Sequence, residues 1–170
     1  KIFPPVKNQA QCGSCWAFSA TSNVESVTAL HSGQQAKSLS EQFLVDCDHG
    51  CGQYRFENGC DQGCNGGLQP NAFKKIISKG GMPSEGSYPY TGRDGSCRSG
   101  SPVSGSKIAS WEFVTENEEQ IAAYVATHGP VSVAVDAAHW SFYNGGIMKS
   151  SSICPQNVGP ANLDHGVNIV

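Results

Sequence analysis

The sequence predicts an α+β fold with two lobes, in which a helical, cross-linked first half precedes a second half that is mostly β. Apolar residues recur at helical spacing in the first half, most clearly over residues 15–31. After residues 99–106, which read S-G-S-P-V-S-G-S, short runs of β-forming residues take over. Most of the eight cysteines precede residue 70, which favours disulfide cross-links in the first half.

A chain of 170 residues is long enough to bury a core, and it suits one domain or two small lobes that share a site. Charged residues make up 15% of the chain, against about 25% in an average soluble domain. The net charge is −3 without a Lys/Arg cluster, and no apolar run approaches the roughly 18 residues of a membrane span. We therefore expect a monomer with neither nucleic acid nor membrane as a partner. Lys1 does not begin a signal peptide, so any targeting segment is expected outside this chain.

The first half is predicted to hold three helices. An extended arm over residues 1–8 precedes a helix from Cys15 to His31, with Gly33 as its stop. The apolar positions of that helix are Ala17, Ala20, Val24 and Val27, with Leu30 close by.

Turn and cap signals mark the next two helices. Ser38 and Glu41 have the spacing of a capping box ahead of a short apolar run, which predicts a second helix. Residues 46–69 are rich in Cys, Gly and Asp and are expected to form a stapled loop. Pro70 then begins a third helix that ends at Gly80.

The second half is predicted to hold one helix among strands. Asn117 and Gln120 have capping-box spacing for a helix over Asn117–Thr127, and Gly129 ends it. The chain stops inside the apolar run N-I-V, so we expect a truncation at the C-terminus. The predicted strands are Ile108–Val114, Val131–Val135, Gly145–Lys149 and His165–Val170.

The cysteine count suggests an oxidising compartment, although the spacing leaves two alternatives open. Cys12 and Cys15 form a C-x-x-C, which Cys60 and Cys64 could complete as a zinc site. A thioredoxin-type redox motif is the other alternative, but Trp16 follows the second cysteine and no βαβ pattern surrounds it.

Cys15 is a candidate nucleophile because it lies at the predicted start of the first helix. Free N–H groups and the positive end of the helix dipole meet there and favour thiolate, the nucleophilic form. The alternative is that Cys12 and Cys15 are both in disulfides. Of the five histidines, His165 is the candidate acid/base partner, because it opens a strand in L-D-H-G-V and a strand holds a side chain rigidly. The remaining histidines occupy ordinary surface, capping or turn positions: His31, His49, His128 and His139.

The sequence C-G-S-C-W, with a histidine 150 residues after its second cysteine, is the signature of one protease family. By this signature the chain resembles papain-like cysteine proteases of the cathepsin L and F type, and the resemblance covers essentially its whole length. The supporting matches are P-V-K-N-Q at 5–9, S-L-S-E-Q at 38–42, L-V-D-C-D at 44–48, G-C-N-G-G at 63–67, Y-P-Y at 88–90, G-P-V-S-V at 129–133, Y-N-G-G-I at 143–147 and L-D-H-G-V at 163–167.

The resemblance implies a role for each matching residue. Cys15 is the expected nucleophile, His165 its imidazolium partner and general acid, and Gln9 an oxyanion-hole donor together with the N–H of Cys15. Gly66 and Gly67 are expected to pair with the extended substrate backbone, where glycine allows close approach. Trp16 and Ser19 are expected to pack on the catalytic helix without chemistry, and the substrate-binding set is completed by Leu68, Ala134, Leu163 and Asp164.

The resemblance also implies a disulfide pattern. It pairs Cys12 with Cys64 and Cys47 with Cys97, and it gives Cys154 a partner beyond the C-terminus. Cys51 and Cys60 are extra to the papain pattern and resemble an insertion in some plant and amoebal members. The simplest expectation is a Cys51–Cys60 bond, with pairing elsewhere as the alternative.

Two departures from the family pattern stand out. The family's third catalytic member is an Asn in N-S-W-G, roughly twenty residues past the histidine, whereas this chain ends at Val170. Neither Asn162 nor Asn168 is expected to replace it. The family's mature N-terminus and its prodomain also carry residues that are not here. We therefore expect one incomplete papain-like domain over 1–170 that is a poor enzyme by itself, with a left lobe at about 9–104 and an incomplete, β-barrel-like right lobe at about 1–8 plus 105–170.

The implied function is a cysteine endopeptidase, a hydrolase made as a zymogen, that prefers an apolar residue second from the scissile bond on the acyl side (P2). Its expected partners are extended peptides or proteins, its own prodomain and cystatin-like inhibitors. No cofactor and no metal are expected, and the compartment would be lysosomal, vacuolar or extracellular. One rival is a non-catalytic binding module, although such members usually replace the nucleophile or the base, and both are present here. A thiol oxidoreductase is the other rival.

Overall fold

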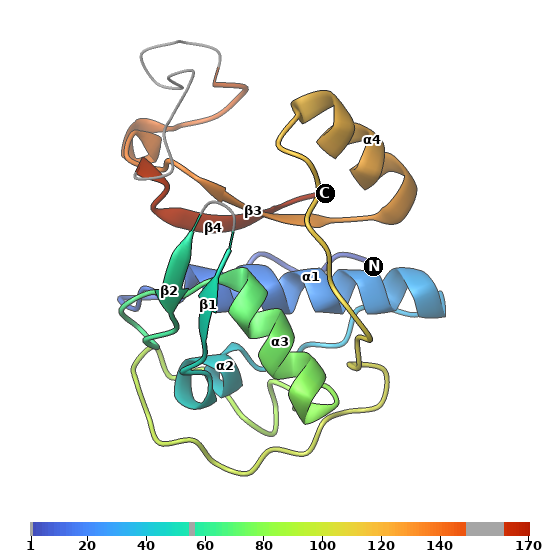
Figure 1. Ribbon diagram of the computed structural model, residues 1–170, viewed down its shortest axis with the longest axis vertical. Coiled ribbons are helices and arrows are strands. Elements are labelled where there is room, and N and C mark those ends of the chain that lie inside the picture. Colours follow the sequence, from blue (N-terminus) through green and yellow to red (C-terminus); the bar gives the residue numbers. More distant parts are fainter. Residues whose placement is uncertain (1, 55–56, 149–161) are drawn as a thin grey trace.

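The computed structural model describes residues 2–54, 57–148 and 162–170. Helix α1 lies across the middle of the molecule (Figure 1). On one side of it lie α2, α3 and a small hairpin, and on the other side lie β3, β4 and α4. This is the mixed helix and strand composition that the sequence predicts, and the α+β class is confirmed.

Helix α1 spans Cys15–Ser32, one residue beyond the predicted end. Gly33 ends it with φ of 65°, a left-handed conformation that glycine adopts without steric cost. The helix is buried by elements on both sides, which is why its apolar residues are not confined to one narrow stripe. Its buried residues are Trp16, Ala17, Ser19, Ala20, Thr21, Val24, Glu25, Ser26 and Ala29.

Helix α2 spans Glu41–Cys47, but its cap differs from the prediction. Ser40, not Ser38, is the N-cap, and its hydroxyl accepts the N–H of Phe43 at 3.0 Å. The carboxylate of Glu41 does not return to the cap, because it accepts a hydrogen bond from Lys7 Nζ at 2.6 Å.

Helix α3 spans Gln69–Lys79, with Pro70 in its first turn and Gly80 as its left-handed cap, as predicted. The stapled loop before it contains an antiparallel hairpin that the sequence analysis did not predict. Strand β1 (Cys51–Gln53) pairs with β2 (Asn58–Cys60) in the register Cys51↔Cys60. Glycine and asparagine are poor strand formers, so the strand propensities of these residues do not reveal the hairpin.

Strands β3 (Val131–Val135) and β4 (His165–Ile169) pair antiparallel, with Val135 opposite His165. Helix α4 (Glu118–His128) precedes them and is capped by Asn117, whose side chain accepts the N–H of Gln120 at 3.1 Å. A short 3-10 helix, η1 (Trp140–Phe142), follows β3.

Two predicted strands are wrong. Residues 108–114 form no strand, and their aromatic side chains pack instead: the rings of Trp111 and Phe113 lie 5.9 and 6.0 Å from that of Tyr54. High β-propensity without a neighbouring strand to pair with leaves an extended connection. Residues 145–148 are also irregular, since Gly145 and Gly146 both have positive φ; Lys149 lies outside the described residues.

The buried core lies around α1, α2 and α3. It includes one buried ion cluster: Lys7 contacts both Glu25 (2.9 Å) and Glu41 (2.6 Å), and these two carboxylates are almost fully buried. Burial raises the pKa of Glu41 to about 7, although Lys7 opposes that change. The core residues are Trp16, Ala17, Ala20, Val24, Leu39, Phe43, Leu44, Val45, Cys47, Ala72, Ile76, Met82 and Tyr88.

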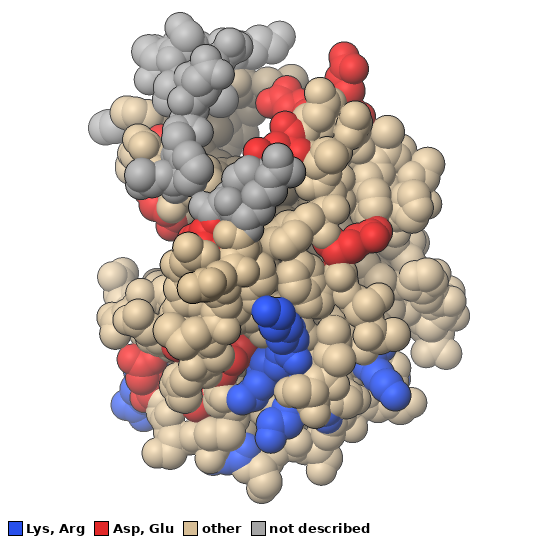
Figure 2. All heavy atoms as spheres, in the orientation of Figure 1, with Lys and Arg blue, Asp and Glu red and all other residues tan. Residues whose placement is uncertain are grey.

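The visible charges are distributed unevenly over the surface. Figure 2 shows Lys and Arg side chains only over the lower part of this face, whereas Asp and Glu side chains lie both around the α4 end and at the lower left. Within the part of the chain that the structure describes, no helix is both long and apolar enough to cross a membrane.

Candidate active site

Cys15 is the first residue of α1 and is half-buried. Among the described residues it is the only cysteine outside a disulfide. The preceding Ser14 does not cap the helix with its side chain, because its hydroxyl lies 2.7 Å from the hydroxyl of Tyr90. The first turn of α1 also contains no acidic residue. The thiol therefore stands at a helix N-terminus without a competing carboxylate, where an anion is stabilised.

His165 is the first residue of β4, the strand that packs on α1. A Cβ placed on the adjacent Gly166 would lie 2.8 Å from Gln69 Nε2 and 3.4 Å from the carbonyl carbon of Cys15, so the absence of a side chain at Gly166 lets β4 approach the start of α1. The ring of Trp140 lies 5.7 Å from that of His165 and nearly perpendicular to it. The fold thus brings the start of β4 to the start of α1, although His165 and Cys15 are 150 residues apart in the chain.

Hydrogen bonds hold β4 against α1. The amide of Asn168 donates to the carbonyl of Ser19 at 3.0 Å and accepts from the hydroxyl of Ser132 at 2.9 Å. The hydroxyl of Ser19 donates to the carbonyl of Val167 at 2.9 Å. Ser19 and Asn168 therefore fix the strand that carries His165.

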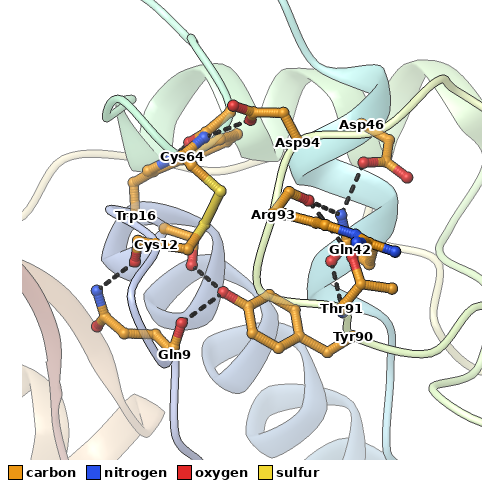
Figure 3. The surroundings of a disulfide bond; sticks show 12 residues. Gln9, Cys12, Trp16, Gln42, Asp46, Cys64, Tyr90, Thr91, Arg93 and Asp94 are labelled. Atoms are coloured by element: carbon orange, nitrogen blue, oxygen red, sulfur yellow. Dashed lines mark hydrogen bonds between the residues drawn. A yellow bond between two sulfur atoms is a disulfide. The ribbon is translucent and has the colours of Figure 1, made fainter.

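Gln9 lies beside the Cys12–Cys64 disulfide (Figure 3). Its Nε2 donates to the carbonyl of Cys12 at 2.9 Å, which uses one of its two amide protons. Its backbone carbonyl accepts from the hydroxyl of Tyr90 at 2.8 Å. Burial raises the pKa of Tyr90, so this phenol stays a neutral donor that holds the Gln9 segment in place.

The segment Gly66–Leu68, the expected substrate strand, runs past the side chain of Trp16. A Cβ at Gly67 would lie 2.5 Å from the indole of Trp16, so only glycine fits there. The N–H of Leu68 donates to Asp61 Oδ1 at 2.8 Å. The N–H of Gln62 also donates to the carbonyl of Gly66 at 2.9 Å. One close approach and these two hydrogen bonds therefore help to set the path of the segment.

The expected P2 residues come from both sides of α1. Leu68 is buried and packs toward β2, whereas Ala134 and Leu163 are exposed. Asp164 accepts the N–H of Ala137 at 2.8 Å and donates its own N–H to Val135, which orders the turn before His165.

Gln69 was not predicted as a site residue, yet it links the two sides. Its Nε2 donates to the carbonyl of Val133 at 3.2 Å, so the first residue of α3 contacts β3 beside the expected substrate segment. Nothing in the sequence distinguishes Gln69 from an ordinary polar residue of a helix start.

The structure contains the three disulfides that the resemblance implies: Cys12–Cys64, Cys47–Cys97 and Cys51–Cys60. Three of the four cysteines of the zinc alternative, Cys12, Cys60 and Cys64, are therefore in disulfides. In the described ranges, no group of three or more His, Cys, Asp or Glu side chains is arranged to hold a metal ion. Cys154 lies outside the described residues.

Comparison with known proteins agrees with this geometry. A family model described as "Papain family cysteine protease" matches residues 1–170. The chain is 50% identical to cysteine proteinase 1 of Dictyostelium discoideum over 167 residues, which cover 98% of this chain and 47% of that protein. It is 45% identical to procathepsin L of Mus musculus over 168 residues, which cover 98% of this chain and 46% of that protein.

Solved structures lead to the same family. Digestive procathepsin L 3 of the Tenebrio molitor larval midgut matches with a TM-score of 0.82 and 36% identity, covering 99% of this chain and 51% of that one. The chain spans about half the length of the curated relatives it matches. The chain belongs to the papain family of cysteine proteases.

Proposed function

We propose that the protein carrying this chain is a cysteine endopeptidase in which Cys15 is the nucleophile and His165 its acid/base partner. The observation that carries the proposal is the unpaired thiol of Cys15, placed at the first residue of α1 against the strand that begins with His165. Family membership supports the same reaction class.

In the proposed acylation step, the Cys15 thiolate attacks the carbonyl carbon of the scissile peptide. A C–S bond forms, the carbonyl oxygen becomes an oxyanion, and the C–N bond then breaks as His165 gives its proton to the leaving amine. In deacylation, His165 takes a proton from water, and the hydroxide attacks the thioester. The C–S bond breaks with the thiolate as leaving group, the acid product leaves, and the thiolate–imidazolium pair is restored.

Gln9 and the N–H of Cys15 are the proposed oxyanion donors. One amide proton of Gln9 is engaged by Cys12, and the other is available for the substrate. Donors that are already in place stabilise charge that develops only in the tetrahedral intermediate, at no reorganisation cost.

The substrate is proposed to bind in an extended form along Gly66 and Gly67, with its P2 side chain toward Leu68, Ala134 and Leu163. None of these three side chains is charged, so a charged P2 residue would lose hydration without compensation. Asp164 has its carboxylate occupied by the N–H of Ala137, which leaves it as an organiser of the turn.

The division into a left lobe at about 9–104 and a right lobe at about 1–8 plus 105–170 belongs to the same proposal, with the site between the lobes. So do a prodomain, inhibition by cystatin-like proteins, a monomeric state and a lysosomal, vacuolar or extracellular location. The three disulfides favour an oxidising compartment.

The test is hydrolysis of fluorogenic dipeptidyl substrates by the complete protein, with the P2 residue varied. We expect Leu and Phe to be cleaved with higher kcat/KM than Arg, and no cleavage by Cys15→Ser. A preference for Arg would contradict the apolar pocket. A folded protein that cleaves none of the peptides would contradict the endopeptidase proposal.

A peptide epoxide separates the protease from its two rivals. A cysteine endopeptidase should be alkylated once, at Cys15, and the rate should depend on the peptide part of the reagent. A thiol oxidoreductase should react without regard to the peptide, and a non-catalytic binding module should not react at all.

A further inference from the structure

Two buried aspartates lie beside the expected substrate segment. Asp48 directly follows α2, and Asp61 directly follows β2; each is only 2% exposed. Asp61 Oδ1 accepts the N–H of Leu68 at 2.8 Å and the amide of Asn71 at 3.1 Å. Asp48 Oδ1 accepts the N–H of Gly50 at 3.0 Å. Each carboxyl thus uses one oxygen to hold a neighbouring segment.

The second oxygen of each carboxyl has no donor among the described residues: both Asp48 Oδ2 and Asp61 Oδ2 are buried and unpartnered there. Gly50 links the two aspartates: its N–H donates to Asp48 Oδ1 at 3.0 Å, and its carbonyl accepts the N–H of Asp61 at 2.9 Å and the amide of Asn71, which also donates to Asp61 Oδ1. Two carboxylates cannot both ionise cheaply in such a place, and a single proton between them would satisfy both orphaned oxygens. Burial, reinforced by the neighbouring Asp48, raises the pKa of Asp61 to about 8, against the lowering effect of its bonds from Leu68 and Asn71.

The other charged and titratable groups around the pair are two lysines with partners of their own, a histidine and a glutamate. From α3, Lys75 donates to the carbonyl of Cys47, and Lys74 lies 4.6 Å from the centre of the Tyr54 ring. His49 lines the same surface hollow as Asp48, and burial raises the pKa of Glu57 in the hairpin. From α1, the uncharged Trp16 faces Gly67, which also lies next to Asp61. Within the described part of the chain, neither aspartate forms an ion pair.

Asn71 joins the pair to the hairpin. Its amide also approaches the carbonyls of Gly50 and Gly59, each at 3.2 Å, while its Oδ1 accepts from the hydroxyl of Tyr54. The end of α2, the hairpin, the start of α3 and Leu68 are therefore connected through one small polar cluster. A second negative charge in that cluster would push Asp61 and Asp48 apart, and Leu68 is bonded directly to Asp61.

We propose that Asp48 and Asp61 share one proton, and that this carboxyl pair positions the Gly66–Leu68 segment so that loss of the proton weakens substrate binding. The pair acts through the backbone of Leu68 and not on the substrate itself, so both aspartates are positioning residues. The part about substrate rests on the proposed function of Gly66–Leu68; the shared proton does not.

The direction of the pH effect follows from the raised pKa of Asp61. The folded protein holds a proton that the unfolded chain releases near pH 4. The stabilisation from the pair is complete below that pH and is lost as the pH rises toward about 8. The Gly66–Leu68 segment should lose its fixed position as the folded protein releases this proton, with a midpoint near pH 8.

The test compares Asp61→Asn and Asp48→Asn with the wild type in the complete protein. Either amide keeps the accepting oxygen and supplies a permanent hydrogen to the other carboxylate. Thermal midpoints are measured from pH 4.5 to 9, and KM and kcat for a Leu-P2 dipeptidyl substrate over the range in which the enzyme is active. Asp94→Asn is the matched control, since its exposed carboxylate also accepts a backbone N–H, from Cys64 at 2.7 Å, but has no carboxyl neighbour in the cluster.

We expect the wild type and Asp94→Asn to lose thermal stability between pH 4.5 and 8, and both cluster variants to lose clearly less. We also expect KM to rise near pH 8 in the wild type but not in the cluster variants, with kcat following the same profile in all. Identical thermal profiles for all four proteins would overturn the shared proton. Altered thermal profiles with an unchanged KM profile would overturn the positioning role. If no variant cleaves peptide, the proposed function fails, and the thermal comparison still decides the shared proton.

Discussion

The two parts of the chain that meet at Cys15 are held together in different ways. Residues 12–106 contain the whole buried core and all three disulfides of the described structure. In 107–148 and 162–170, by contrast, Pro130 is the only buried residue among those whose side chains are described. Large apolar side chains are exposed in this second part, including Ile147 at 82% and Phe113 at 58%.

The difference shows which forces place each half of the site. Cys15 is placed by a packed interior, whereas His165 is placed by strand pairing between β3 and β4 and by the polar bonds of Asn168 and Ser19 to α1. Packing against a core tolerates small polar changes. The contact between β4 and α1, called the seam below, depends on a few hydrogen bonds of Asn168 and Ser19 and does not tolerate them. Substitutions should therefore separate stability in the first part from catalysis at the seam.

The largest effect should come from the site itself. Cys15→Ala should lower kcat/KM at least about 10⁴-fold, because no other group supplies the nucleophile. The thermal midpoint should change little, since Cys15 is only half-buried and bonded to no partner in the described structure. Steady-state kinetics and calorimetry on the complete protein check this. A variant that keeps most of its activity would show that Cys15 is not the nucleophile.

Lys7→Ala should be the most destabilising change for the core of residues 12–106, because Lys7 is the counter-ion of two carboxylates buried there. It leaves the buried carboxylates of Glu25 and Glu41 without their counter-ion, at a cost of about 3–5 kcal/mol in the free energy of unfolding. Lys79→Ala, at an exposed position, is the control and should change that free energy by less than about 0.5 kcal/mol. Denaturant unfolding measures both, and equal effects would contradict the ion cluster.

The stability of Lys7→Ala should also depend on pH in a different way from that of the wild type. Burial raises the pKa of Glu41 to about 7, so its contribution to wild-type stability is complete below about pH 4.5 and falls as the pH rises to about 7. Without Lys7 this fall should be larger and extend to higher pH, because Lys7 opposes the rise in pKa. A Lys7→Ala protein whose stability falls less with pH would contradict that assignment.

Removing the hairpin disulfide should matter less. Cys51 and Cys60 are 9 positions apart, and closing so short a loop contributes about 2–3 kcal/mol at most. The double variant Cys51→Ser/Cys60→Ser should keep nearly full turnover, because Asn71 still joins Gly50 and Gly59. A collapse of kcat would mean that the bond supports the substrate segment directly.

The seam should respond to a still smaller perturbation. Asn168→Ala removes the bonds to Ser19 and Ser132 and should cost about 1–2 kcal/mol. Unlike Lys7→Ala, it should lower kcat, since it loosens the strand that carries His165. Ser132→Ala keeps the Asn168–Ser19 bond and should have a weaker effect in the same direction. An unchanged kcat in Asn168→Ala would show that these bonds do not set the position of β4.

The sequence predicted the helices well because their signals are local. The spacing of apolar residues, Pro70 and the glycines at 33 and 80 lie within the elements that they define. The capping-box spacing predicts Ser38 as the cap of α2, whereas the cap is Ser40; Glu41 binds Lys7, 34 positions away, and no local pattern shows that bond. The strand predicted at 108–114 failed for a similar reason: propensity does not supply a pairing partner.

The residues of the candidate site also differ in whether a local sequence pattern reveals them. Cys15, His165 and Gln9 stand in family motifs, and their roles stay predictions. Gln69, Asn168 and Asp61 are single polar residues that look like surface positions in the sequence, and Asp48 ends the motif L-V-D-C-D without any sign of a partner. The hydrogen bonds of Gln69 and Asn168 join segments that are far apart in the chain, so only the folded arrangement identifies these residues.

In the proposed mechanism, Cys15 from one part and His165 from the other act as one nucleophilic pair. The most direct test is the rate at which iodoacetamide alkylates the complete protein at pH 6, with the label mapped by mass spectrometry, in the wild type and in His165→Ala. We predict rapid labelling of Cys15 alone in the wild type and much slower labelling in His165→Ala. Equal rates in the two proteins, or label mainly on another cysteine, would show that Cys15 and His165 do not act as a pair.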